Sequence, residues 1–147
     1  MWKIWISIIA TCWVTSAAAQ GWSNDRIAEM LVRELSPTGA MESGQWFVSN
    51  EKLTPGVHGL GVIYAHIPGS AGSVSIHVGL FSWTGAGWEK RLDVAGVFGL
   101  APKDAAFFQT HVEISTLTLG PNEPRCCPTV IARWSIDYAR GQAVRVP

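Results

Sequence analysis

Two stretches of the chain carry an apolar residue or a threonine at every second position, and a loop rich in proline separates them. The first stretch covers residues 106–116 and the second covers residues 130–138. This period of two is typical of a β-strand that buries one face. We predict that the two strands pair through the loop Gly120–Thr129, with Ile114 opposite Trp134. The chain is therefore expected to build an antiparallel sheet around this loop.

The loop contains two adjacent cysteines, Cys126 and Cys127, followed by Pro128. Neighbouring Cα atoms lie about 3.8 Å apart, whereas a relaxed disulfide separates them by roughly 4.4–6.8 Å. A residue before proline also prefers an extended backbone, which points neighbouring side chains to opposite faces. Local geometry thus disfavours a disulfide between the two cysteines, although an oxidising compartment favours some disulfide.

Three outcomes for the cysteines stay open: a strained vicinal disulfide, two buried inert thiols, or a bridge between molecules. If the vicinal disulfide forms, it can act as a redox switch or simply stiffen one hairpin connection. We favour the stiff connection, because proline and glycine around the pair already mark a rigid turn.

The string GPNEPRCCPT, followed by the alternating VIARWSIDY, resembles a loop-and-strand pattern of small secreted bacterial proteins of uncharacterised function. The resemblance covers the C-terminal third of the chain, and Cys-Cys-Pro is its specific part. It implies a compartment and a fold, and it implies no particular activity.

The N-terminus has the features of a signal peptide. Lys3 supplies a positive charge before the apolar run Ile4–Val14, and the alanines that end at Ala19 fit a small-residue cleavage site. The apolar run is shorter than the roughly 20 residues that span a bilayer. We predict that residues 1–19 are a signal peptide and that residues 20–147 form a single secreted or periplasmic domain without a transmembrane segment.

Cleavage would remove Cys12 and leave only the adjacent cysteine pair. The competing interpretation, a lipoprotein lipidated on Cys12, fits poorly because Thr11 is not the small residue expected there. The sequence contains 11 basic and 11 acidic residues, and the basic ones are scattered singly. Without a basic stripe, we expect no nucleic-acid partner.

The N-terminal part of the predicted domain begins with an amphipathic helix that ends near Leu35. Ile27, Leu31 and Leu35 recur at the spacing of one helix face, and Ser23 or Asn24 can cap the helix. We expect this apolar face to lie on a sheet.

From residue 57 onward the pattern indicates antiparallel β-structure, with a hairpin turn at Thr84–Trp88. A three-residue loop with Gly87 in the left-handed conformation would pair Leu80 with Leu92 and keep one face apolar. We interpret residues 96–103 as a connection. The predicted fold is α+β: one N-terminal helix packed on a twisted antiparallel sheet of five or six strands in meander order.

The alternation directs five aromatic and histidine residues to the outward face of this sheet: Tyr64, His66, His77, Phe81 and Trp83. An exposed patch of this kind marks a ligand or partner surface. The alternative is that the N-terminal segment or residues 36–56 cover it, in which case the aromatic residues belong to the core.

The candidate metal ligands are His66, His77, His111 and Glu113, but their spacing lacks a tight pattern such as H-x-x-x-H. We therefore predict neither a metal nor another cofactor. The sequence also lacks a G-x-S-x-G elbow and a glycine-rich phosphate loop, and nothing singles out catalytic residues.

Three functions remain. The leading hypothesis is a secreted or periplasmic non-enzymatic protein that binds an unknown protein or small ligand through the outward aromatic and histidine face. The first alternative is a thiol-redox protein that acts through Cys126 and Cys127. The second alternative is a purely structural envelope protein.

Overall fold

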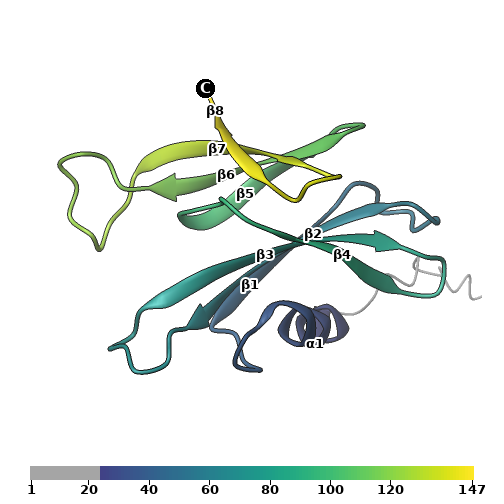
Figure 1. Ribbon diagram of the computed structural model, residues 1–147, viewed down its shortest axis with the longest axis horizontal. Coiled ribbons are helices and arrows are strands. Elements are labelled where there is room, and N and C mark those ends of the chain that lie inside the picture. Colours follow the sequence, from purple (N-terminus) through teal and green to yellow (C-terminus); the bar gives the residue numbers. More distant parts are fainter. Residues whose placement is uncertain (1–23) are drawn as a thin grey trace, which may run out of the picture.

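The computed structural model describes residues 24–147, so the predicted signal peptide lies outside the described residues. Within them, one helix and two antiparallel sheets form three layers, with the first sheet in the middle (Figure 1). The sheet orders are β1-β2-β3-β4 and β5-β6-β7-β8. The elements are α1 (Asn24–Leu35), β1 (Ser43–Val48), β2 (His58–His66), β3 (Val74–Trp83), β4 (Trp88–Val94), β5 (Leu100–Phe107), β6 (His111–Thr118), β7 (Val130–Asp137) and β8 (Ala143–Val146).

The α+β class is confirmed, whereas the prediction of a single sheet with five or six strands is wrong. Each sheet holds four strands, and within each sheet every strand pairs with the next one along the chain. The chain passes from the first sheet to the second between Gly96 and Gly99, which both have positive φ angles. Ala95 also forms a parallel bridge with Gln142, which ties the β4 side of the first sheet to the β8 side of the second.

The predicted long strand over residues 106–116 is in fact a hairpin. β5 ends at Phe107, β6 begins at His111, and the Phe108 amide donates to the His111 carbonyl over 2.8 Å. The turn contains none of the Gly, Pro, Asn or Asp residues that usually mark a turn. Because the apolar alternation continues through it, the sequence pattern did not reveal the break.

The helix lies close to the first sheet because two glycines clear the space for it. Gly61 of β2 lies directly opposite Gly79 of β3. A Cβ atom would come 2.4 Å from the Leu31 side chain at Gly61, and 2.6 Å from the Leu35 side chain at Gly79. At such distances the leucine side chains or the helix would have to shift, so the two glycines leave the room in which the predicted helix face packs.

The first sheet is buried on both faces. Leu60, Val62 and Tyr64 of β2 pack toward the second sheet, whereas Ile63 and Phe81 pack toward the helix. A strand that is covered on both faces is apolar at consecutive positions, so alternation no longer separates an inner face from an outer one. This is why the inward and outward assignments for β2 failed.

The predicted pairing of Leu80 with Leu92 is confirmed, but the loop that produces it differs. Residues 84–87 form the loop, and Gly85, not Gly87, has the positive φ angle. A register shift immediately after Leu80 compensates for the extra loop residue. The one-sided apolar face of β4 therefore fixed the register more strongly than the turn did.

Residues 96–103 do not form a simple connection, because β5 begins at Leu100. β5 is an irregular edge strand, with two register shifts against β6 and positive φ angles at Ala101 and Asp104. Pro102 lies between these two residues. Bulges and proline on an edge strand discourage pairing with another chain.

Candidate functional site

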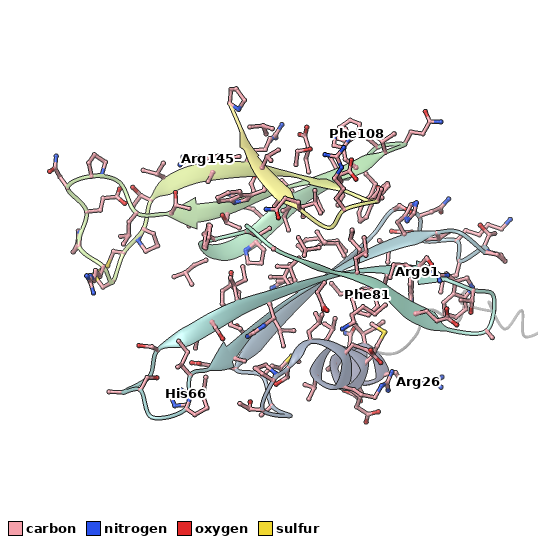
Figure 2. All side chains as sticks on the ribbon, viewed as in Figure 1. Arg26, His66, Phe81, Arg91, Phe108 and Arg145 are labelled. Carbon is pink, nitrogen blue, oxygen red and sulfur yellow. A yellow bond between two sulfur atoms is a disulfide. The ribbon has the colours of Figure 1, made fainter. Side chains whose placement is uncertain are left out.

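The five residues predicted to form an outward face do not share one exposed surface. Tyr64 is only 7% exposed and faces the second sheet, whereas Phe81 is 1% exposed and lies under the helix. His77 is on the Phe81 side of the sheet, and Trp83 packs against the same cluster as Phe81. Figure 2 shows His66 near the β2–β3 turn, well away from Phe81. The expected aromatic and histidine face is therefore wrong as a single surface.

The aromatic residues under the helix form a packed cluster. The ring of Trp46 in β1 packs edge to face on those of Phe81 and Trp88, with centroid distances of 5.3 Å and 4.9 Å. The rings of Trp83 and Trp88 pack in the same way, with centroids 5.5 Å apart. Such pairs add about 0.5–1.5 kcal/mol each beyond the area that they bury. The alternative interpretation thus holds for this part: the N-terminal helix and Trp46 cover the aromatic residues, which belong to the core.

An apolar groove is lined by residues of both sheets and of the cysteine loop, residues 120–129. The β2–β3 turn and this loop diverge at the same end of the molecule (Figure 1). The volume of the groove is about 600 Å³, within the usual range of small-molecule sites, which is about 300–1,000 Å³. Three exposed apolar side chains border it, namely Phe98 (64%), Leu100 (42%) and Leu119 (48%). The remaining lining residues are Tyr64, Val74, Ser75, Ile76, Gly99, Leu117, Thr118, Arg125 and Pro128.

Hydrogen bonds fix the wall of the groove from behind. The Trp134 indole N–H donates to the Thr116 hydroxyl over 2.8 Å, and that hydroxyl donates to the Phe98 carbonyl over 2.6 Å. The Tyr64 hydroxyl donates to the Gly99 carbonyl over 2.8 Å. Burial raises the pKa of Tyr64 to about 12, so this donor stays protonated at neutral pH. The groove is therefore held open by the fold itself.

The cysteine loop forms the outer rim of the groove. The structure joins Cys126 and Cys127 in a disulfide, and both residues are exposed, so the alternative of two buried inert thiols is wrong. The Cys127 amide donates to the Pro124 carbonyl over 3.1 Å, which makes a tight turn with Arg125 at its tip. Pro128 lines the groove beside it.

One carboxylate ties the two ends of the loop together. Glu123 accepts hydrogen bonds from the Gly120 amide over 2.9 Å and from the Thr129 amide over 3.0 Å, and it also accepts one from the Thr129 hydroxyl. The bond from Gly120, followed by those from Thr129, holds the pKa of Glu123 below its usual value. At neutral pH this ionised clamp therefore closes the loop, and the disulfide stiffens the turn inside it.

The sequence interpretation missed the residues that border the groove. Phe98 and Leu100 flank Gly99, and Leu119 precedes Gly120. Large apolar residues beside a glycine in a connecting segment were the available signal, because connecting segments run over the surface. Their common location depends on the arrangement of the two sheets, which the alternation alone did not indicate.

A smaller, polar hollow of about 300 Å³ brings His111, Ser135 and Asp137 together at the other end of the second sheet. His111 lies opposite Asp137, in the same register as the predicted pair Ile114 and Trp134, and its Nε2 is 3.6 Å from a carboxylate oxygen of Glu113. The Asp137 carboxylate accepts from two backbone amides of the following turn. Within residues 24–147 no hydrogen bond links Ser135 to His111, so the three residues do not form a nucleophilic triad.

A larger hollow, of about 670 Å³, lies between α1 and β1, and Leu31 and Trp46 are among its lining residues. Asn24, the first residue that the structure describes, lines it as well. We assign this hollow no role.

Comparison of the chain with protein-family models, with curated proteins and with solved structures found no match. In the part of the chain that the structure describes, no three histidine, cysteine, aspartate or glutamate side chains are grouped to hold a metal ion. Over the same residues, the only helix is α1, and no helix is long and apolar enough to cross a membrane. The function must therefore be argued from the groove and its rim.

Proposed function

We propose that the protein is an exported, non-enzymatic binding protein that holds a small apolar molecule in the groove between its two sheets. The observation that carries this proposal is the apolar border of Phe98, Leu100 and Leu119 around a groove of about 600 Å³. Exposed apolar side chains gathered around a concavity mark binding sites far more often than scattered ones do.

The hydrogen bonds behind the groove support the same function. Thr116 and Tyr64 fix the backbone carbonyls of Phe98 and Gly99, so little conformational freedom remains to be lost when a ligand enters. A site that is already ordered binds more tightly than one that must first be assembled. The proposal thus retains the predicted class, a ligand-binding protein, but places the site between the two sheets and not on the outer face of β2 and β3.

A neutral, apolar fluorescent probe, N-phenyl-1-naphthylamine, tests this function. We expect saturable binding with a rise in probe fluorescence, and we expect Leu119→Glu to weaken it about tenfold or more because a charge would enter an apolar site. Ile131→Glu is the matched control, because Ile131 is 61% exposed and does not line the groove. If both variants bind like the parent protein, or if the parent does not bind, the proposed function is wrong.

A second candidate function is thiol–disulfide exchange at Cys126 and Cys127, which the exposure of both residues favours. In this reaction a thiolate of an external dithiol attacks one sulfur and forms a mixed disulfide. The second thiol of the donor then attacks the donor sulfur of this mixed disulfide and releases the bound cysteine. The donor leaves as a disulfide, and this chain gains two thiols.

Equilibration with mixtures of reduced and oxidised dithiothreitol, followed by thiol counting, tests the exchange function. For a redox protein we expect a reduction potential in the range of about −270 to −120 mV, whereas structural disulfides usually lie below about −300 mV. A potential below that limit would leave the disulfide only the stiffening role predicted for the loop.

A further inference from the structure

The groove contains one charged side chain among its lining residues, that of Arg125. This residue is exposed, and within residues 24–147 its guanidinium group has no hydrogen bond or ion pair. The nearest acid along the chain, Glu123, is directed back into the loop by the amides of Gly120 and Thr129. A positive charge with unused donors therefore stands at the rim of an otherwise apolar site.

The other polar side chains of the groove are already engaged with the protein. The Tyr64 hydroxyl donates to the Gly99 carbonyl, and the Thr118 hydroxyl donates to the Val130 carbonyl. Ser75 bonds to His77, over 2.8 Å. Of the polar side chains that line the groove, Arg125 alone is left to meet a polar group of a ligand.

The backbone at Arg125 is held in place more firmly than the backbone of a free loop. It lies at the tip of the turn that the Cys127 amide closes on the Pro124 carbonyl, and the Cys126–Cys127 disulfide locks that turn. The Glu123 clamp fixes the base of the same loop. Because the loop backbone is already fixed, only the Arg125 side chain has to be ordered when its guanidinium forms paired hydrogen bonds with a carboxylate.

From these contacts we infer that the ligand is an amphipathic carboxylate. Its apolar chain or ring occupies the space between Leu100, Leu119 and Ile76, and its carboxylate pairs with Arg125 at the rim. This inference rests on the proposed function and specifies its ligand class. It also gives the cysteine loop a role in binding, because the disulfide positions the residue that recognises the charge.

Titration calorimetry with three twelve-carbon probes, kept below their micelle concentrations, tests this inference: dodecanoate, dodecanol and dodecyltrimethylammonium. We expect dodecanoate to bind about tenfold more tightly than dodecanol, and the cation to bind more weakly than both. Arg125→Gln should remove the preference for the acid and leave the dodecanol affinity unchanged. Arg145→Gln removes the same charge from an exposed residue of β8 outside the groove and should change nothing (Figure 2).

Each result separates this inference from the function on which it rests. If dodecanol and dodecanoate bind equally and Leu119→Glu weakens both, the apolar site is real and the carboxylate assignment is wrong. The assignment is also wrong if Arg125→Gln keeps the acid preference, or if Arg145→Gln removes it. If none of the probes binds, the proposed function fails together with the inference.

Discussion

The two ends of the sheet sandwich are closed in different ways. At one end the ring of His58, at the start of β2, stacks on Tyr138, just after β7, with centroids 4.3 Å apart and planes 18° apart. At the other end Phe98, Leu100 and Leu119 remain exposed around the groove. The same two sheets therefore meet through stacked rings at one end and stay apart at the other.

The difference indicates what keeps the groove from closing. At the stacked end, side chains of the two sheets pack on each other directly. At the groove end, the Tyr64 hydroxyl spans the gap to the Gly99 carbonyl, and Thr116 holds the Phe98 carbonyl from behind. Hydrogen bonds with fixed geometry therefore hold the wall of the groove at this end. Three predictions test whether the two ends are in fact independent.

The largest effect is expected at Thr116. Thr116→Val keeps the shape but removes both the acceptor for the Trp134 indole and the donor to the Phe98 carbonyl. Because Thr116 is completely buried, unpaired groups remain there, and we expect the free energy of unfolding to fall by about 2 kcal/mol. Probe binding in the groove should weaken as well. Urea denaturation and the fluorescence titration measure the two effects.

Thr118→Val is the control for this change. It is the same substitution two residues further along β6. It removes a single hydrogen bond, the 3.2 Å bond that the Thr118 hydroxyl donates to the Val130 carbonyl. We expect a loss of about 0.5–1 kcal/mol. An equal loss in the two variants would mean that the network behind the groove has no special weight.

A smaller effect separates the two tyrosines, one at each end. Burial raises the pKa of both Tyr64 and Tyr138 to about 12, and each hydroxyl donates to a backbone carbonyl. We expect Tyr64→Phe to cost about 1 kcal/mol of stability and to weaken probe binding, because the Gly99 carbonyl loses its anchor. Tyr138→Phe should cost about half as much and leave binding unchanged. Equal effects on binding would contradict the separation of the two ends.

Much of the local structure could be predicted from the sequence. The helix was predictable because Ile27, Leu31 and Leu35 recur at the spacing of a helix that covers one surface. The pairing of Ile114 with Trp134 was predictable because β6 and β7 bury one face each, which permits a single register. Where only one face of a helix or strand is covered, the spacing of its apolar residues indicates which face is buried and, for a strand, its register.

The division into two sheets was not predictable in the same way. The turn at Phe108 lacks any residue with a special backbone preference. The Phe108 ring stacks on His111 there, with centroids 4.6 Å apart, and this contact stabilises the turn but leaves no pattern in the sequence. β2 is covered on both faces, so the alternation of its residues did not indicate which face points toward the second sheet and which toward the helix. Because of these two features, the sequence predicted one sheet where the structure has two.

The candidate site was predictable only in its rim. The cysteine loop was found from its composition, but the sequence argument treated Cys127, the residue before Pro128, as extended, whereas the Cys127 amide closes a turn on the Pro124 carbonyl. That turn changes the direction of the two side chains, and so the outcome disfavoured by an extended backbone is the one observed. The groove itself joins residues from β2, β3, β5 and β6, and no local pattern records their proximity.

The smallest effect is a difference in acid sensitivity between the two ends. Burial lowers the pKa of His58 from 6.5, so the folded state binds this proton more weakly than the unfolded state does. The stability that His58 contributes is therefore present above pH 6.5 and is lost as the pH falls from there through its folded pKa. For Glu123 the hydrogen bonds lower the pKa from 4.5, so its contribution persists until the pH falls below 4.5.

Nuclear magnetic resonance during an acid titration distinguishes the two windows. The ring signals of Tyr138 should move first, below pH 6.5, and the amide signals of Gly120 and Thr129 should move only below pH 4.5. His58→Phe keeps a ring on Tyr138 without a titrating group, so it should abolish the first transition and leave the second. Movement of the loop amides together with Tyr138 would show that both ends respond as one unit, because the groove rim would then depend on the stacked end for its stability.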